Sequence, residues 1–171
     1  EAGPDGSWIE SSTHGLPLIL HADDLIVTPH SGSWAVWLGG DYNETAYIEQ
    51  NVTVPSSSPY LSYYHWIASQ DICGYDYDYG WVKINGSTVR TYELCDGNDT
   101  NGWDYETVDL SSYAGQTVEL QIGMYADIVF NSNWFIDDVA FQTSPSAIED
   151  VSHPPITTPS PSDPSDVRPR Q

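Results

Sequence analysis

Apolar and polar residues alternate with a period of two along most of the first 143 residues of the chain. Between residues 117 and 125, Val118, Leu120, Ile122 and Met124 alternate with polar residues or glycine. This alternation is typical of β-strands that bury one face. It predicts strands at residues 16–21, 33–38, 45–54, 60–69, 79–84, 87–94, 105–110, 117–125 and 133–142.

Short strands separated by turns, with no segment of helical periodicity, indicate an all-β, two-sheet antiparallel sandwich. The strand spacing alone does not distinguish a jelly roll from an immunoglobulin topology. The chain lacks the Cys…Trp…Cys arrangement of immunoglobulin domains, and this favours the jelly-roll β-sandwich.

The composition changes sharply near residue 143. Residues 144–171 are rich in Pro, Ser and Thr, and such a segment cannot build a hydrophobic core. We therefore predict a jelly-roll domain at residues 1–143 and an extended tail or linker at residues 144–171.

The chain is strongly acidic, with 25 Asp and Glu against four Lys and Arg and a net charge of −21. Nucleic-acid binding requires cations that neutralise phosphates, so the charge excludes this class of function, and anionic membranes would repel such a surface. No apolar run approaches the length of a transmembrane helix, so membrane insertion is not expected.

The only two cysteines are Cys73 and Cys95. Asn85-Gly86, a strong hairpin signal, lies between them, and a hairpin centred there brings Cys95 back toward residues 73–76. We therefore expect a disulfide rather than two buried thiols, with a contribution of about 3 kcal/mol from loop entropy. A disulfide indicates an oxidising compartment.

Four Asn-x-Ser/Thr sequons lie in predicted turns or on polar strand faces. In a secreted protein they are acceptors for N-glycosylation, although Asn-Gly-Ser and Asn-Asp-Thr are also favourable turn sequences. With the disulfide and a chain that begins at Glu1 without a signal peptide, they predict a processed extracellular or cell-surface glycoprotein. The four asparagines are Asn43, Asn51, Asn85 and Asn98.

Several segments resemble the MAM-like, galactose-binding-like jelly-roll modules of secreted bacterial surface proteins. The most specific are Asp-Leu-Ser-Ser-Tyr-Ala-Gly-Gln-Thr-Val at residues 109–118 and Phe-Ile-Asp-Asp-Val at residues 135–139. The resemblance implies a two-sheet jelly roll without catalysis of its own, often with a structural calcium ion. Weaker similarity covers residues 3–8, 30–38, 48–55, 103–110 and 134–141.

Asp137 and Asp138 lie in an otherwise apolar strand. Adjacent strand residues point to opposite faces, so at least one carboxylate should lie near the core or a sheet edge. In a chain with few cations, calcium is a natural partner because it binds carboxylate and carbonyl oxygens. The resemblance implies that the N-terminal segment, with Asp5 and Glu10, completes the site. The alternative is an aspartate that caps backbone amides without a metal.

Two further groups of residues suggest binding. Asp71, Asp76 and Asp78 crowd one loop, where they form either a second cation site or a solvated acidic loop. Exposed aromatic rings can stack on sugars, but many tryptophans in one sandwich more often belong to the core; the tryptophans in question are Trp37, Trp66, Trp81 and Trp103.

The sequence does not predict an enzyme, because it shows neither metal-ligand histidine spacing nor a G-x-S-x-G motif. Our main hypothesis is a non-catalytic structural or adhesive glycoprotein that self-associates, its tail docking on a neighbouring subunit. The alternative is a calcium-stabilised carbohydrate-binding module of a larger secreted enzyme. In the first hypothesis, the docking residues are Ile148, Val151, Ile156, Val167, Arg168 and Arg170.

Overall fold

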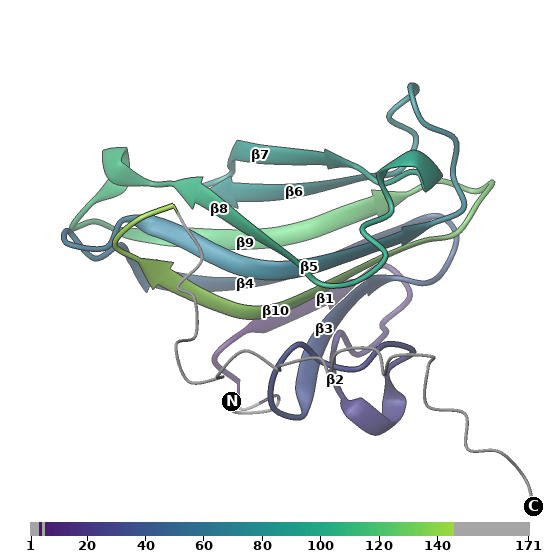
Figure 1. Cartoon of the computed structure of the whole chain (residues 1–171), viewed down its shortest axis with the longest axis horizontal. Helices are drawn as coiled ribbons and strands as arrows, with labels where there is room; N and C mark the ends of the chain where they lie inside the picture. The colour runs from purple at the N-terminus through teal and green to yellow at the C-terminus, as the bar shows by residue number, and fades with distance from the viewer. Residues whose placement is uncertain (1–3, 5, 146–171) are drawn as a thin grey trace, which may run out of the picture.

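Two five-stranded antiparallel sheets pack face to face in the computed structural model of the chain, which describes residue 4 and residues 6–145 (Figure 1). The first sheet has the order β1 (Ile9–Ser12), β4 (Glu44–Thr53), β9 (Thr117–Ala126), β6 (Tyr79–Ile84) and β7 (Ser87–Glu93). The second has the order β2 (Ile19–His21), β3 (Trp34–Gly39), β10 (Ser132–Gln142), β5 (Tyr60–Ser69) and β8 (Asp104–Asp109). This is the predicted jelly-roll sandwich.

Three short 3-10 helices lie in the connections between strands: η1 (Ala22–Asp24), η2 (Asp96–Asn98) and η3 (Ser111–Tyr113). None of the helices in the described part of the chain has the length and apolar character that crossing a bilayer requires.

The core lies between the sheets and follows the alternation of the sequence. In β9, Val118, Leu120, Ile122 and Met124 are at most 1% exposed, and the residues between them face outward. The second sheet contributes large buried side chains, among them Trp134. Tyr63 and Trp134 are the aromatic members of this buried cluster, and its other members are aliphatic residues and Met124.

The β6–β7 hairpin turns at Asn85-Gly86, as the sequence predicts. Both residues have positive φ, 50° at Asn85 and 77° at Gly86, as a type I′ turn requires. Strand β9 pairs with β4 on one side and β6 on the other, so the hairpin extends the first sheet to its β7 edge.

Strand β10 contains a bulge at the acidic pair. Asp137 pairs with Tyr64 and Ala140 pairs with Ser62, so Asp138 and Val139 together oppose one residue of β5. Asp138 has φ of 50°, a left-handed conformation that aspartate tolerates better than most residues. The bulge thus interrupts the regular alternation of side chains between the two faces of β10 at the two aspartates.

Several sequence predictions concern residues outside the described part of the chain, and the structure does not test them. They include the calcium ligand Asp5 and the proposed tail contacts of Ile148, Val151, Ile156, Val167, Arg168 and Arg170.

Candidate functional site

Asp137 and Asp138 hold the loop that precedes β3 against strand β10. Asp137 Oδ2 accepts hydrogen bonds from the backbone amides of His30 and Ser31, at 2.8 and 3.2 Å. Asp138 contacts His30 Nδ1 and the Ser31 hydroxyl, both at 2.7 Å. The His30 ring also stacks on Tyr64, with 3.5 Å between ring centroids.

These contacts are those of the alternative interpretation, in which an aspartate caps backbone amides. Glu10 also binds backbone amides, because its Oε2 accepts hydrogen bonds from Leu18 and Ile19. No three acidic, histidine or cysteine side chains within the described residues converge as a metal site. Asp5 lies outside those residues, so calcium binding stays a prediction.

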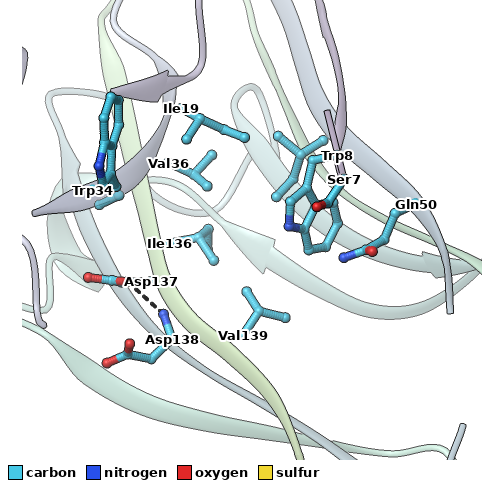
Figure 2. A pocket seen from close by; sticks show the side chains of 12 residues that line it. Ser7, Trp8, Ile19, Trp34, Val36, Gln50, Ile136, Asp137, Asp138 and Val139 are labelled. Atoms are coloured by element: carbon cyan, nitrogen blue, oxygen red, sulfur yellow. Dashed lines mark hydrogen bonds between the residues drawn. The ribbon is translucent and has the colours of Figure 1, made fainter. Parts of the chain in front are cut away.

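A hollow of about 450 Å³ lies beside the bulge, between the two sheets. Figure 2 shows Ile136 and Val139 directed to the same side of β10 as Trp8, whereas the carboxylates of Asp137 and Asp138 lie on the opposite side of the strand. Trp8 packs against the hydrophobic core. The hollow therefore adjoins apolar side chains of the core, while Ser7, Gln50, Asp137 and Asp138 contribute polar groups to its lining.

The loop between β5 and β6, residues 70–78, projects beyond the end of the sheets at the upper right of Figure 1. The Cys73–Cys95 disulfide predicted from the sequence is present and fixes this loop to the end of β7. The Glu93 carboxylate also accepts the amides of Gly74, Tyr75 and Asp76. The loop is therefore anchored both covalently and by hydrogen bonds.

This anchored loop presents exposed tyrosines. Tyr75 and Tyr77 are 65% and 47% exposed, and their rings stack with 11° between planes. Tyr79, at the start of β6, is 39% exposed. We call Tyr75, Tyr77 and Tyr79 the tyrosine surface, which was not predicted from the sequence.

A second surface hollow, of about 310 Å³, adjoins the tyrosine surface. It is lined by Asp76, Tyr79, Thr91, Tyr92 and Glu93. Tyr79 is the member of the tyrosine surface that lines this hollow, so carboxylate and hydroxyl groups lie next to its exposed ring. This combination offers apolar faces for stacking and polar groups for hydrogen bonding in one place.

Beyond Tyr79, the outer face of the first sheet carries a packed polar and aromatic row. The Trp81 indole donates to Gln121 Oε1 at 2.8 Å, and Gln121 Nε2 donates to Glu49 Oε2 at 2.9 Å. Lys83 Nζ lies 4.3 Å from the centre of a Trp81 ring. Trp81 is only 6% exposed, so it supports the surface but offers little ring area to a ligand.

The other three tryptophans considered as a sugar platform are partly exposed, and two of them are hydrogen-bonded. Trp37 donates to Asn133 and Trp103 donates to the carbonyl of Thr28. Trp66 packs edge-on against Trp103. All three lie outside the core cluster and are partly exposed, so the core interpretation does not hold for them, and a role in sugar binding stays a prediction.

The acidic loop residues play separate roles. Asp78 is buried and accepts the Ser132 hydroxyl and the amide of Asp127, at 2.6 and 2.7 Å. Burial raises the pKa of the Asp78 carboxyl. Asp71, also buried, accepts the amide of Ile72, whereas Asp76 is exposed. Asp78 thus connects the start of β6 to the end of β9 and the start of β10, whereas the carboxylate of Asp71 binds the backbone of its own loop.

All four sequon asparagines are exposed, so an attached glycan would have access to solvent at each. Asn85 and Asn98 also stabilise turns: Asn85 Oδ1 accepts the amide of Glu119, and Asn98 Nδ2 donates to the carbonyl of Glu93. Glycosylation of the four sequon asparagines stays a prediction. These residues are Asn43, Asn51, Asn85 and Asn98.

No protein-family model matches the sequence. Bacillopeptidase F of Bacillus subtilis (strain 168) is 29% identical over 111 residues, which are 60% of this chain. The match spans 7% of the length of that protein. The chain thus resembles one small part of a much longer protein.

Solved structures that share the fold include an adhesin domain and a carbohydrate-binding module. The K2 cleaved adhesin domain of Lys-gingipain gives a TM-score of 0.52 at 18% identity, over 81% of this chain and 89% of that domain. The module TmCBM61, solved with β-1,4-galactotriose, also gives 0.52 at 16% identity, over 81% and 92% of the two chains. These similarities establish the jelly-roll sandwich, and the narrower MAM-like resemblance stays a prediction.

Proposed function

We propose that this chain is a non-catalytic glycan-binding module of a larger extracellular protein. The observation that carries the proposal is the tyrosine surface beside a hollow with acidic and hydroxyl side chains. Aromatic rings pack against the apolar C–H faces of sugars, while carboxylates accept hydrogen bonds from sugar hydroxyls. Tyr75, Tyr77 and Tyr79 would supply stacking, and Asp76 and Glu93 would orient the sugar.

The anchoring of the loop supports this function. A binding loop that is already ordered loses less conformational entropy when a ligand binds. The Cys73–Cys95 disulfide and the Glu93 carboxylate provide that order. Because two carboxylates line the hollow, the expected ligand is an uncharged sugar rather than an acidic one.

The fold comparisons support the glycan-binding hypothesis better than the assembly hypothesis. The structures that share the fold include a carbohydrate-binding module in complex with a galactose oligosaccharide and an adhesin domain. The disulfide and the exposed sequons support an extracellular location. Assembly through the tail depends on residues outside the described part of the chain.

Binding to immobilised neutral polysaccharides, followed by titration calorimetry with soluble oligosaccharides, tests the proposal. We would begin with β-1,4-galactan and include a polygalacturonate as the acidic comparison. Replacing Tyr75 and Tyr79 together by alanine should weaken binding about tenfold or more, equivalent to about 1.4 kcal/mol. Tyr42→Ala is the matched control, because Tyr42 is 48% exposed and does not line the hollow.

Two results would contradict the proposal. One is the absence of binding to every neutral polysaccharide tested. The other is binding that the Tyr75→Ala/Tyr79→Ala protein retains in full while its melting temperature is unchanged, since the ligand would then use another surface.

A further inference from the structure

Three consecutive apolar residues are exposed at the turn between β9 and β10. Ile128, Val129 and Phe130 are 74%, 57% and 38% exposed, and we call them the apolar tip. Their loop extends past the right-hand end of the sheets in Figure 1. A contiguous exposed apolar run in a soluble domain marks an interaction surface more often than an isolated apolar residue does.

The apolar tip is held by its neighbours. The Asp127 carboxylate accepts the amide of Val129 at 2.8 Å, and the Asp127 amide donates to buried Asp78. The Asp127 carbonyl accepts the amide of Asn43 from the adjacent loop. The three exposed side chains therefore lie on a turn whose backbone is held by hydrogen bonds within the turn and to neighbouring loops.

The loops around the tip add further apolar and acidic groups. Tyr42 is 48% exposed in the loop between β3 and β4, and Ile72 is 54% exposed in the loop between β5 and β6. Asp41, Asp76 and Asp127 lie in these same loops. The described residues contain only two Lys or Arg, and both are engaged elsewhere: Lys83 over Trp81 and Arg90 with Glu106.

We propose that the apolar tip is a docking surface for residues 164–171 of the same molecule. That segment contains Val167 together with Arg168 and Arg170, half of all Lys and Arg in the chain. It is the only place in the sequence where two basic residues lie within three positions of each other, and they directly follow an apolar residue. Val167 would pack on the tip, and the two guanidinium groups would face the surrounding carboxylates.

The length of the tail allows this contact within one molecule. Residues 145 and 167 are separated by 22 positions, and a proline-rich chain extends about 3.1 Å per residue, or about 68 Å. The longest strand, β10, has 11 residues and spans about 36 Å. The tail can therefore return from the end of β10 to the opposite end of the sandwich.

Two physical effects favour contact within one molecule over contact between molecules. A tethered segment has an effective concentration of about 1 mM. By contrast, two bodies that each carry a large negative charge repel one another. A weak charge-assisted contact can thus be populated in one molecule without producing assembly.

Hydrogen–deuterium exchange of the full chain tests the proposal through the peptide covering residues 127–131. Replacing both arginines by glutamine, Arg168→Gln and Arg170→Gln, should raise its exchange rate about threefold, as expected when two exposed ion pairs are lost. High salt should produce the same change in the unaltered chain. The matched control is Thr157→Glu with Thr158→Glu, which lowers the net charge equally at a different part of the tail and should leave the exchange rate unchanged.

Three outcomes would overturn the proposal, and each indicates a different state of the apolar tip. Equal exchange in the arginine variant and the unaltered chain means that the tip is not covered by this segment. Protection that rises with protein concentration means that a second copy covers it. Protection that appears only on adding phosphatidylcholine vesicles means that a bilayer does. None of these results depends on glycan binding.

Discussion

At the scale of single residues, His65 is the clearest buried titratable group. It is 5% exposed, and its Nδ1 accepts the indole N–H of Trp134 at 3.1 Å. Burial lowers the pKa of His65, while the carboxylates of Glu106 and Asp104 act in the opposite direction. A protonated Nδ1 could not accept the Trp134 hydrogen bond.

The lowered pKa of His65 predicts a loss of stability in acid. The unfolded chain takes up the histidine proton near pH 6.5, whereas the folded chain takes it up only at lower pH. Unfolding is therefore favoured as the pH falls through 6.5 toward the folded-state pKa. Between pH 7.5 and 5, the native protein should lose more stability than His65→Gln, which keeps an acceptor oxygen but does not titrate. Parallel urea titrations measure the difference, and identical pH dependence in the two proteins would contradict this role.

Gly123 permits the close packing of the row that supports the outer face of the first sheet. A Cβ atom there would lie 2.6 Å from Tyr47 Cβ and 2.8 Å from both the Ala46 carbonyl oxygen and Trp81 Cζ2. We predict that Gly123→Ala lowers the free energy of unfolding by about 1–3 kcal/mol, the usual effect of overpacking. Thr88→Ala, at an exposed position of strand β7 in the same sheet, should change it by less than about 0.5 kcal/mol. Equal urea midpoints for the two variants would show that the sheet relaxes around the added methyl group.

The residues of the tyrosine surface could not have been identified from the sequence alone. Tyr75 and Tyr77 alternate with Asp76 and Asp78, and this alternation resembles that of a solvated acidic loop. Exposure depends on how the disulfide and Glu93 fix the loop, which is a tertiary property. Conversely, Trp81 lies on an outer face and is nevertheless buried, because Tyr47, Lys83 and Gln121 surround it.

At the scale of elements, the alternation predicted nearly all of the sheet structure. Strands β5 and β6 begin and end at the predicted residues. Strand β1 (Ile9–Ser12) was not predicted, because this four-residue edge strand has no clear alternation. Nor was the bulge in β10, because the left-handed φ of Asp138 arises from its bonds to the loop before β3.

The disulfide should contribute substantially to the stability of the sandwich. Cys73 and Cys95 are 22 residues apart, and closing a loop of this size costs the unfolded chain about 3 kcal/mol of entropy. Replacing both cysteines by serine should lower the free energy of unfolding by that amount and weaken glycan binding through disorder of the β5–β6 loop. Urea titration measures the first effect. Mass analysis of non-reduced peptides checks the premise, since two free thiols in the native protein would refute it.

Calcium binding at the β10 bulge remains a testable prediction. A cation that binds only the folded state raises its stability by mass action, about 2.7 kcal/mol at a hundredfold excess over Kd. The melting temperature should therefore be higher in calcium than in excess chelator. The shift should disappear when Asp137 and Asp138 are both replaced by asparagine, which retains acceptors for the backbone amides. Equal melting curves in calcium and chelator would refute the site and leave amide capping as the role of both residues.

At the scale of the whole molecule, the dominant feature is the excess of negative charge. Residues 1–143 contain 21 acidic residues and two basic ones, so ion pairs can neutralise few carboxylates. Among the described residues, Arg90–Glu106 is the one ion pair that involves Lys or Arg. Cohesion must therefore come from the apolar core and the strand ladders, while the surface charges repel one another.

This balance predicts that simple salt stabilises the protein. Raising NaCl from 0.01 to 1 M shortens the Debye length from about 30 to about 3 Å, which screens repulsion among the surface carboxylates. The melting temperature should therefore rise steadily over this range, with most of the rise below about 0.2 M, where screening changes most. Tetramethylammonium chloride provides the control: screening is common to all monovalent salts, so an equal rise identifies it, whereas a rise with sodium alone would indicate site-specific binding. A melting temperature that falls or stays constant in both salts would mean that attractive charge contacts offset the repulsion, contrary to the composition of the chain.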